Sequence, residues 1–117
     1  MNIIFGTSEA EELKKKYIVL ELDTITIRGS NPITVYTVIE NMPLDQLPKA
    51  EKYIDLHSNL IKNYRLRNWD FCLQSINQLL GFWGGQADSF YEVLSARIMT
   101  YIENEPDESW TGIIAKS

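Results

Sequence analysis

Cysteine and histidine are almost absent from the 117-residue sequence, which contains one of each. Cys72 has no second cysteine with which to form a disulfide inside the chain, so the disulfide-stapled scaffolds of small secreted domains are excluded. A zinc site needs several His or Cys ligands, and His57 has no second His and no nearby Cys in the sequence. We therefore expect Cys72 to be a small buried residue on the apolar face of a helix. We expect His57 at a surface or boundary position.

Basic charge and long apolar runs are also scarce. Eleven Lys and Arg stand against sixteen Asp and Glu, which gives a net charge of −5. Dedicated nucleic-acid-binding domains present a basic surface, so that class is disfavoured. No apolar run reaches the roughly 18 residues of a membrane-spanning helix, and the first residues lack the pattern of a signal peptide. These absences predict a cytoplasmic protein that contacts neither nucleic acid nor membrane.

Apolar and aromatic residues, in contrast, are well represented. Hydrophobic residues make up 44% of the chain, and three Trp, six Tyr and four Phe are too many for a disordered segment. A chain of this length folds as one domain, or as two small ones at most, and can bury a core without a metal or a disulfide.

Strand signals dominate the first forty residues. Residues 18–23 follow the two-residue period of a strand, with Ile18, Leu20 and Leu22 on one parity, and the apolar parity then shifts to Ile25 and Ile27. Such a shift predicts a β-bulge near Asp23–Thr24. A turn cluster and the β-branched run 33–39 follow, so the two strands are expected to form an antiparallel hairpin.

A short helix is expected over residues 8–16, before the hairpin. Ser8 and Glu11 have the spacing of a capping box, in which each side chain bonds the other residue's backbone N–H. Acidic residues gather in the first turn and lysines in the last, an order that suits the helix dipole.

After residue 40 the periodicity changes from strand to helix. A linker with Pro43 and Pro48 occupies residues 41–48, and three helical stretches follow within 49–117. The glycine-rich segment 81–85 (GFWGG) predicts a helix end and a loop, because it lacks the Lys-Ser/Thr pair of a phosphate-binding loop.

Two small clusters in the helical part have alternative interpretations. Phe82 and Trp83 are expected to cover the core of the helical hairpin, with an exposed contact surface as the alternative. Lys62, Arg65 and Arg67 are expected to form a solvated helix end. Their alternatives are pairing with the acidic residues after the third helix, or contact with a catalytic domain.

The spacing of aromatic, small and apolar residues resembles the middle of a tetratricopeptide repeat. The residues concerned are Tyr64, Trp69, Cys72, Ile76 and Leu79. A plain helical hairpin gives a similar spacing and remains the alternative. A repeat and a half is shorter than a stable array, so it would need the strand-rich half or another chain to cover its core.

Taken in chain order, these segments resemble the C-terminal part of bacterial class III adenylate and guanylate cyclases. In that family a strand and a short helix precede a hairpin of the form eLDxVxVKG and PvxVYeVl. Many members continue into a helical extension with YrxxdWdxA, an Arg in a third helix and P...WdGv. The matching segments here, which span nearly the whole chain, are 2–10 (NIIFGTSEA), 20–29 (LELDTITIRG), 32–39 (PITVYTVI), 64–70 (YRLRNWD), Arg97, Pro106 and 110–113 (WTGI).

This resemblance implies a function in cyclic nucleotide biosynthesis and intracellular signal transduction. In the family, two Asp hold two metal ions while an Asn and an Arg stabilise the attack of the ribose 3′-hydroxyl on the α-phosphate. Those residues precede the strand matched by Asn2–Phe5, and Asp23 is not a metal ligand in the family pattern. The resemblance therefore implies that this chain alone has no catalytic residue, no metal ligand, no cofactor and no cyclase activity. Mg²⁺ or Mn²⁺ is expected only in a complete cyclase.

One residue is a candidate substrate contact by resemblance. The family's Lys at the hairpin turn can reach the substrate's polyphosphate, and Arg28 stands at that position before Gly29. Arg keeps the positive charge but replaces a point charge with a planar fork. The alternative is a cation at an ordinary hairpin turn.

The sequence thus predicts an α+β fold, with an antiparallel β-hairpin or small sheet and a short helix, followed by a three-helix tetratricopeptide-like region. Residues 1–40 correspond to the end of a cyclase catalytic domain, 41–48 to a linker and 49–117 to the helical extension. The expected partner is a cyclase catalytic domain or a second copy in a homodimer. Three origins are compatible with such a chain: a fragment of a longer protein, the product of a split gene, or a gene whose start is misassigned. A stand-alone, non-enzymatic interaction module is the alternative function, and an unrelated small α+β protein is the third.

Overall fold

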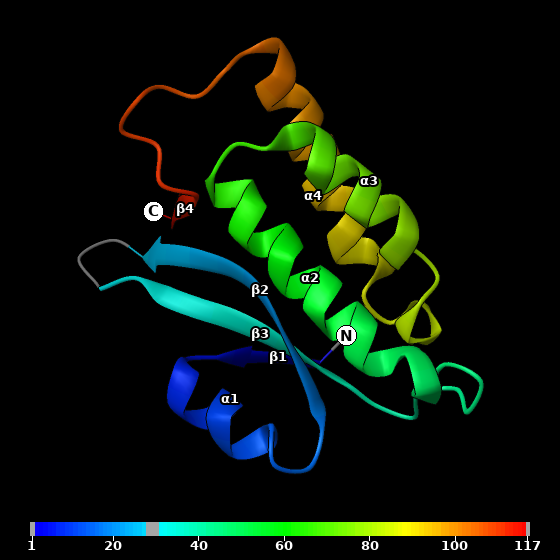
Figure 1. Cartoon of the computed structure of the whole chain (residues 1–117). Helices are drawn as coiled ribbons and strands as arrows, with labels where there is room; N and C mark the ends of the chain where they lie inside the picture. Colours follow the sequence, from blue (N-terminus) through cyan, green and yellow to red (C-terminus); the bar gives the residue numbers. More distant parts are fainter. Residues whose placement is uncertain (1, 28–30, 117) are drawn as a thin grey trace.

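The computed structural model describes residues 2–27 and 31–116, with side chains for 2–27 and 31–113 (Figure 1). The fold is α+β, as the sequence predicts. Its strands and helices, in chain order, are β1 (Asn2–Phe5), α1 (Thr7–Leu13), β2 (Ile18–Ile27), β3 (Ile33–Ile39), α2 (Ala50–Arg65), α3 (Trp69–Leu79), α4 (Asp88–Glu103) and β4 (Ile113–Lys116). Short 3₁₀ helices at Leu47–Lys49 and Trp83–Gly85 precede α2 and α4.

The four strands form one sheet in the order β1-β3-β2-β4. The expected hairpin is confirmed, because β2 and β3 pair antiparallel, and β1 adds to β3 in the same sense. Strand β4 joins the far side of the hairpin, parallel to β2, with Thr24 opposite Ile113. The sequence does not predict this strand, since a strand that pairs with a segment so distant in the chain has no local signature.

The predicted β-bulge is confirmed in β2. Glu21 lies opposite Tyr36 and Asp23 lies opposite Val35, so Leu22 is the extra residue. Leu22 packs into the main core, and the Asp23 carboxylate also meets the helical layer, at Arg97 of α4. The bulge therefore directs two consecutive side chains to the helices, which a regular strand does not do.

The sheet separates two helical layers of unequal size. Helices α2, α3 and α4 lie on one face and α1 lies on the other (Figure 1). The main core joins β2 and β3 to the three larger helices, and a small second core joins α1 to β1 and β3 through Ile4, Ala10, Tyr36 and Val38. The strand-rich and helical parts of the sequence thus share one core.

Helix α1 corrects the expected capping box. It begins at Thr7 and ends at Leu13, with Gly6 at the N-cap and no side-chain capping bond. Ser8 therefore lies inside the first turn rather than before it. Glu11 pairs with Lys14 on the exposed surface at 3.1 Å instead of bonding back to the cap. The start shifts because Gly6 adopts a φ of +98°, a conformation that glycine allows at low cost.

The helical hairpin buries the residues that its spacing selects. Tyr64, Cys72, Ile76 and Leu79 are all at most 3% exposed. The loop after α3 has positive φ at Gly84 and Gly85 and buries Phe82 and Trp83, with Phe82 stacked on Tyr53 at 4.0 Å between ring centroids. The expected covering role of these two aromatics is confirmed. Within the described ranges, no helix has the length and apolar character to cross a membrane.

Candidate functional site

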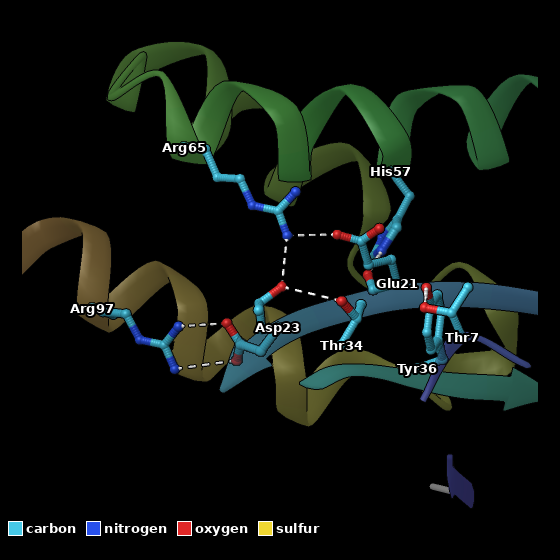
Figure 2. Close-up of polar contacts among 9 residues, drawn as sticks. Thr7, Glu21, Asp23, Thr34, Tyr36, His57, Arg65 and Arg97 are labelled. Carbon is cyan, nitrogen blue, oxygen red and sulfur yellow. Dashed lines mark hydrogen bonds and ion pairs between the residues drawn. The ribbon is translucent and has the colours of Figure 1, made fainter. Parts of the chain in front are cut away.

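A paired carboxylate and guanidinium join the sheet to the helical layer at the bulge. Arg97 of α4 donates to Asp23 of β2 through both terminal nitrogens, with Nη1–Oδ1 at 3.1 Å and Nη2–Oδ2 at 3.5 Å (Figure 2). Only 20% of the Arg97 side chain and 18% of the Asp23 side chain is exposed. A two-pronged pair this far from solvent fixes the angle between α4 and β2 as well as their distance.

Tyr64 at the end of α2 completes this contact. Arg97 Nη1 donates to the Tyr64 hydroxyl oxygen at 3.3 Å, and the guanidinium lies 6.0 Å from the Tyr64 ring centroid. Burial raises the pKa of Tyr64 to about 12, against the opposing effect of Arg97, so the phenol stays protonated. Asp23, Tyr64 and Arg97 therefore link one strand and two helices through a single cation.

Three aromatic rings pack around Tyr64. Tyr64, Trp69, Tyr101 and Trp110 contact one another with centroid separations of 5.3–6.4 Å and mostly edge-to-face angles. Trp110 comes from the segment that leads into β4, so this aromatic cluster fixes the path of the C-terminal tail. Edge-to-face pairs of this kind add to the stability gained from burial alone.

Arg67 fastens the acidic segment after α4 to the same cluster. Its guanidinium lies 5.3 Å from the Trp110 ring, pairs with Glu105 at 3.3 Å and donates to the carbonyl oxygens of Pro106 and Asp107. Trp69 Nε1 donates to the other Glu105 oxygen at 3.1 Å. The expectation of a solvated basic helix end is therefore wrong for Arg67, because the tertiary fold brings the acidic segment beside it.

Arg65, at the last turn of α2, also has a partner in the sheet. Its Nη2 donates to Glu21 at 2.7 Å and to the Thr24 hydroxyl at 3.0 Å (Figure 2). Gly112, just before β4, passes so close that a Cβ built there would lie 3.0 Å from Arg65 Cγ. A cavity of about 360 Å³ opens beside this contact, lined by Glu21, Ser58, Ile61, Lys62, Arg65 and Leu66.

His57 is buried, which corrects its expected surface position. It is 1% exposed in the layer between α2 and the sheet. Its Nδ1 lies 2.9 Å from the Tyr91 hydroxyl, and its Nε2 contacts the carbonyl oxygen of Glu21. Trp83 Nε1 donates to the same Tyr91 oxygen at 3.1 Å. The sequence does not predict this burial, because an isolated histidine in a mixed helical face is compatible with either location.

The partners of His57 determine its tautomer. A carbonyl oxygen only accepts, so Nε2 carries the proton, and Nδ1 of the neutral ring must accept from the Tyr91 hydroxyl. Burial lowers the pKa of His57 below its usual value, against smaller opposing effects of Glu21. Burial also raises the pKa of Tyr91, which keeps its hydroxyl a donor. The hydrogen bonds that run from Trp83 through Tyr91 and His57 to Glu21 are all made only while the imidazole is neutral.

The described residues around Asp23 and Arg97 form a structural junction between the sheet and the helices. In residues 2–27 and 31–116, no three His, Cys, Asp or Glu side chains lie close enough together to hold a metal ion. Asp23 pairs with the Arg97 guanidinium instead. Arg28, the candidate polyphosphate contact, lies outside the described residues.

Two junction residues stand out in the sequence as charges at apolar positions. Asp23 falls on the phase slip of an apolar strand, where a charged side chain needs a partner. Arg97 lies between Leu94 and Tyr101 on the apolar face of α4, again an unusual place for a charge. Two opposite charges on two apolar faces are candidates for a half-buried pair.

Comparisons with protein-family models, with curated proteins and with solved structures find no match for this chain.

Proposed function

We propose that this chain is the C-terminal part of a class III adenylate or guanylate cyclase. In this proposal the sheet completes one side of a catalytic domain, and the helical layer is a regulatory or docking extension. The chain contributes no metal ligand and no transition-state residue, so it has no activity alone. A cyclase catalytic segment, on the same polypeptide or on another, supplies the chemistry in the cytoplasm.

One observation carries this proposal. Residues that the resemblance selects in four separate segments of the sequence meet at one junction. Asp23, Tyr64, Trp69, Arg97 and Trp110 form the ion pair and the aromatic cluster, and Gly112 passes beside Arg65 next to them. A chance resemblance gives no reason for those residues to be neighbours, whereas a shared architecture does.

The test uses the protein from its own cells. An antibody to residues 41–117 captures the native product, whose intact mass is measured and whose turnover of ATP and GTP is assayed with Mg²⁺ or Mn²⁺. We expect cyclic nucleotide formation by the captured material, together with a product heavier than 13.5 kDa or a co-captured chain that contains the catalytic residues.

The isolated chain is the matched control, and we expect it to form no cyclic nucleotide under the same conditions. Captured material of 13.5 kDa that forms no cyclic nucleotide from either substrate contradicts the proposal. Turnover by the isolated chain contradicts the claim that catalysis needs residues from elsewhere.

A second candidate function, the stand-alone interaction module, is favoured by a groove on the helical layer. The groove measures about 560 Å³ and lies between α3 and the end of α4, with Phe71 and Ile102 40% and 49% exposed. Apolar side chains in a surface groove are typical of protein contacts. If this candidate is correct, replacing both residues with Ser should abolish partner binding.

A further inference from the structure

Strand β1 forms one edge of the sheet, and its backbone directs hydrogen-bonding groups outward at two residues. In antiparallel pairs, opposite residues alternate between hydrogen-bonded and non-hydrogen-bonded positions. Gly6 N donates to Thr34 O, so Gly6 and Thr34 form a hydrogen-bonded pair, and Ile4 with Tyr36 is the next one along. The N–H and C=O groups of Ile3 and Phe5 therefore face away from β3.

The same two residues present apolar side chains on the helical side of the sheet. Ile3 lies opposite Thr37 and Phe5 lies opposite Val35, and their exposed fractions are 41% and 60%. Ile4, on the opposite face, is 7% exposed in the small core beneath α1. The helical layer thus stops short of β1 and leaves a strip of two apolar side chains beside it.

Apart from its short length of four residues, this edge has none of the features by which proteins usually block strand addition. Natural edge strands are protected by short length, by Lys, by Pro, by bulges or by a covering element. The sequence of β1 is Asn-Ile-Ile-Phe, and its pairing with β3 is regular throughout. Among the described residues, no strand pairs with its outer side.

We propose that β1 pairs with β1 of a second copy of this chain, antiparallel and about a twofold axis at Ile4. In this register Ile3 lies opposite Phe5 of the second copy, and Phe5 lies opposite its Ile3. Both pairs use the outward N–H and C=O groups, so all of these groups are satisfied. The four-stranded sheet becomes one continuous sheet in the dimer, with both helical layers on the same side.

A second copy fits this edge because β1 is complementary to itself. The outward backbone groups and the exposed side chains belong to the same two residues, and a twofold axis at Ile4 exchanges those residues. The opposed side chains are a β-branched residue and an aromatic one, a favourable cross-strand pair. β1 carries no charge, so two copies of an acidic chain can approach here without direct repulsion. Closed twofold dimers are also the commonest homo-oligomers.

The contact is small, so we expect a dimer that dissociates on dilution. Interfaces below about 1,200 Å² of buried surface are generally weak or transient. Sedimentation velocity of the 117-residue chain between roughly 5 μM and 1 mM covers the dissociation constants expected for such contacts. The monomer should give way to a dimer across this range. A chain that stays monomeric at the upper end overturns the proposal.

Two variants test the edge itself. Ile3→Pro removes one outward N–H and leaves the pairing with β3 intact, and Phe5→Lys places a charge in the apolar strip. Each should raise the dissociation constant at least tenfold. Val93→Lys is the control, because Val93 is similarly exposed, at 57%, on α4. Dimerisation that survives both β1 variants, in proteins whose circular dichroism and melting temperature match the parent, overturns the proposal.

The register has its own test. Ile3→Cys mixed with Phe5→Cys should give a disulfide-linked dimer on mild oxidation, whereas Phe5→Cys alone should give little. Cys72 is buried and does not interfere. Equal cross-linking in both samples overturns the register. These experiments detect mass and cross-links, so their failure is separate from failure of the cyclase assay.

Discussion

Asp23 and Arg97 lie 74 positions apart in the sequence and form a two-pronged ion pair that is about four-fifths buried. The β-bulge at Leu22 brings the carboxylate to the helical side of the sheet, and the apolar face of α4 carries the guanidinium to it. Tyr64 then shares the cation with Asp23. The position of α4 on the sheet depends on this contact, because the remaining contacts between them are apolar and less directional.

Arg97→Gln should destabilise the fold, because it leaves the Asp23 carboxylate with little solvent and no cation. Loss of one partner of such a pair costs about 2–4 kcal/mol, whereas loss of both costs less than the sum of the single losses. Urea unfolding of Arg97→Gln, Asp23→Asn and the double variant measures this coupling. Lys15→Gln is the control, since the pair of Lys15 with Glu12 is exposed and should contribute under about 1 kcal/mol. Strict additivity of the two core variants contradicts the coupling.

His57 should make the fold sensitive to acid. Its pKa is lowered in the folded state, so the unfolded chain binds the proton more tightly, and its contribution to stability is present above the unfolded pKa of about 6.5. That contribution is lost as the pH falls from there toward the lower pKa of the folded state. A proton on Nδ1 would also leave the Tyr91 hydroxyl hydrogen without its acceptor.

The measurement is the free energy of unfolding between about pH 5 and pH 8, compared with that of His57→Gln. The parent should lose stability more steeply than the variant as the pH falls, because all other titrating groups are common to both proteins. Equal slopes in the two proteins contradict a neutral buried imidazole.

Gly112→Ala should weaken the attachment of β4. Gly112 has a φ of +85°, and an added Cβ would meet Arg65 Cγ at 3.0 Å. Gly81→Ala is a matched control, because Gly81 has a φ of +81° and nothing lies within 4 Å of its built Cβ. Both variants should lose about 1 kcal/mol to backbone strain, and only Gly112→Ala should also increase hydrogen exchange of the β4 amides. Equal effects on β4 in the two variants refute the close approach.

Cys72 should be inert in the folded protein. It is buried, and burial raises the pKa of its thiol to about 11, so very little thiolate exists at neutral pH. A thiol reagent at pH 8 should modify it only on unfolding, at a rate that rises with urea. Phe5→Cys supplies an exposed thiol for comparison and should react at once. Rapid modification of Cys72 in the native parent would show that the α2–α3 contact opens easily.

Local periodicity and composition account for the elements that the sequence predicts. Alternation of apolar residues predicts β2, and the β-branched run 33–39 predicts β3. The phase slip predicts a bulge near Asp23–Thr24, and the structure has it at Leu22. The helical spacing of apolar residues predicts the buried faces of α2, α3 and α4, including Cys72. These predictions succeed because side-chain direction repeats every two residues in a strand and every 3.6 in a helix, whatever the rest of the chain does.

Only the tertiary structure decided the features that need two distant segments. The burial of His57, the Asp23–Arg97 pair, the binding of Glu105 by Arg67 and the pairing of β4 with β2 all join segments more than 30 residues apart. A residue's own neighbours in sequence carry no record of which charge or carbonyl will lie opposite it. That choice is made when the sheet and the helices pack, because a buried polar group must then find its partner in whatever segment the core brings within reach.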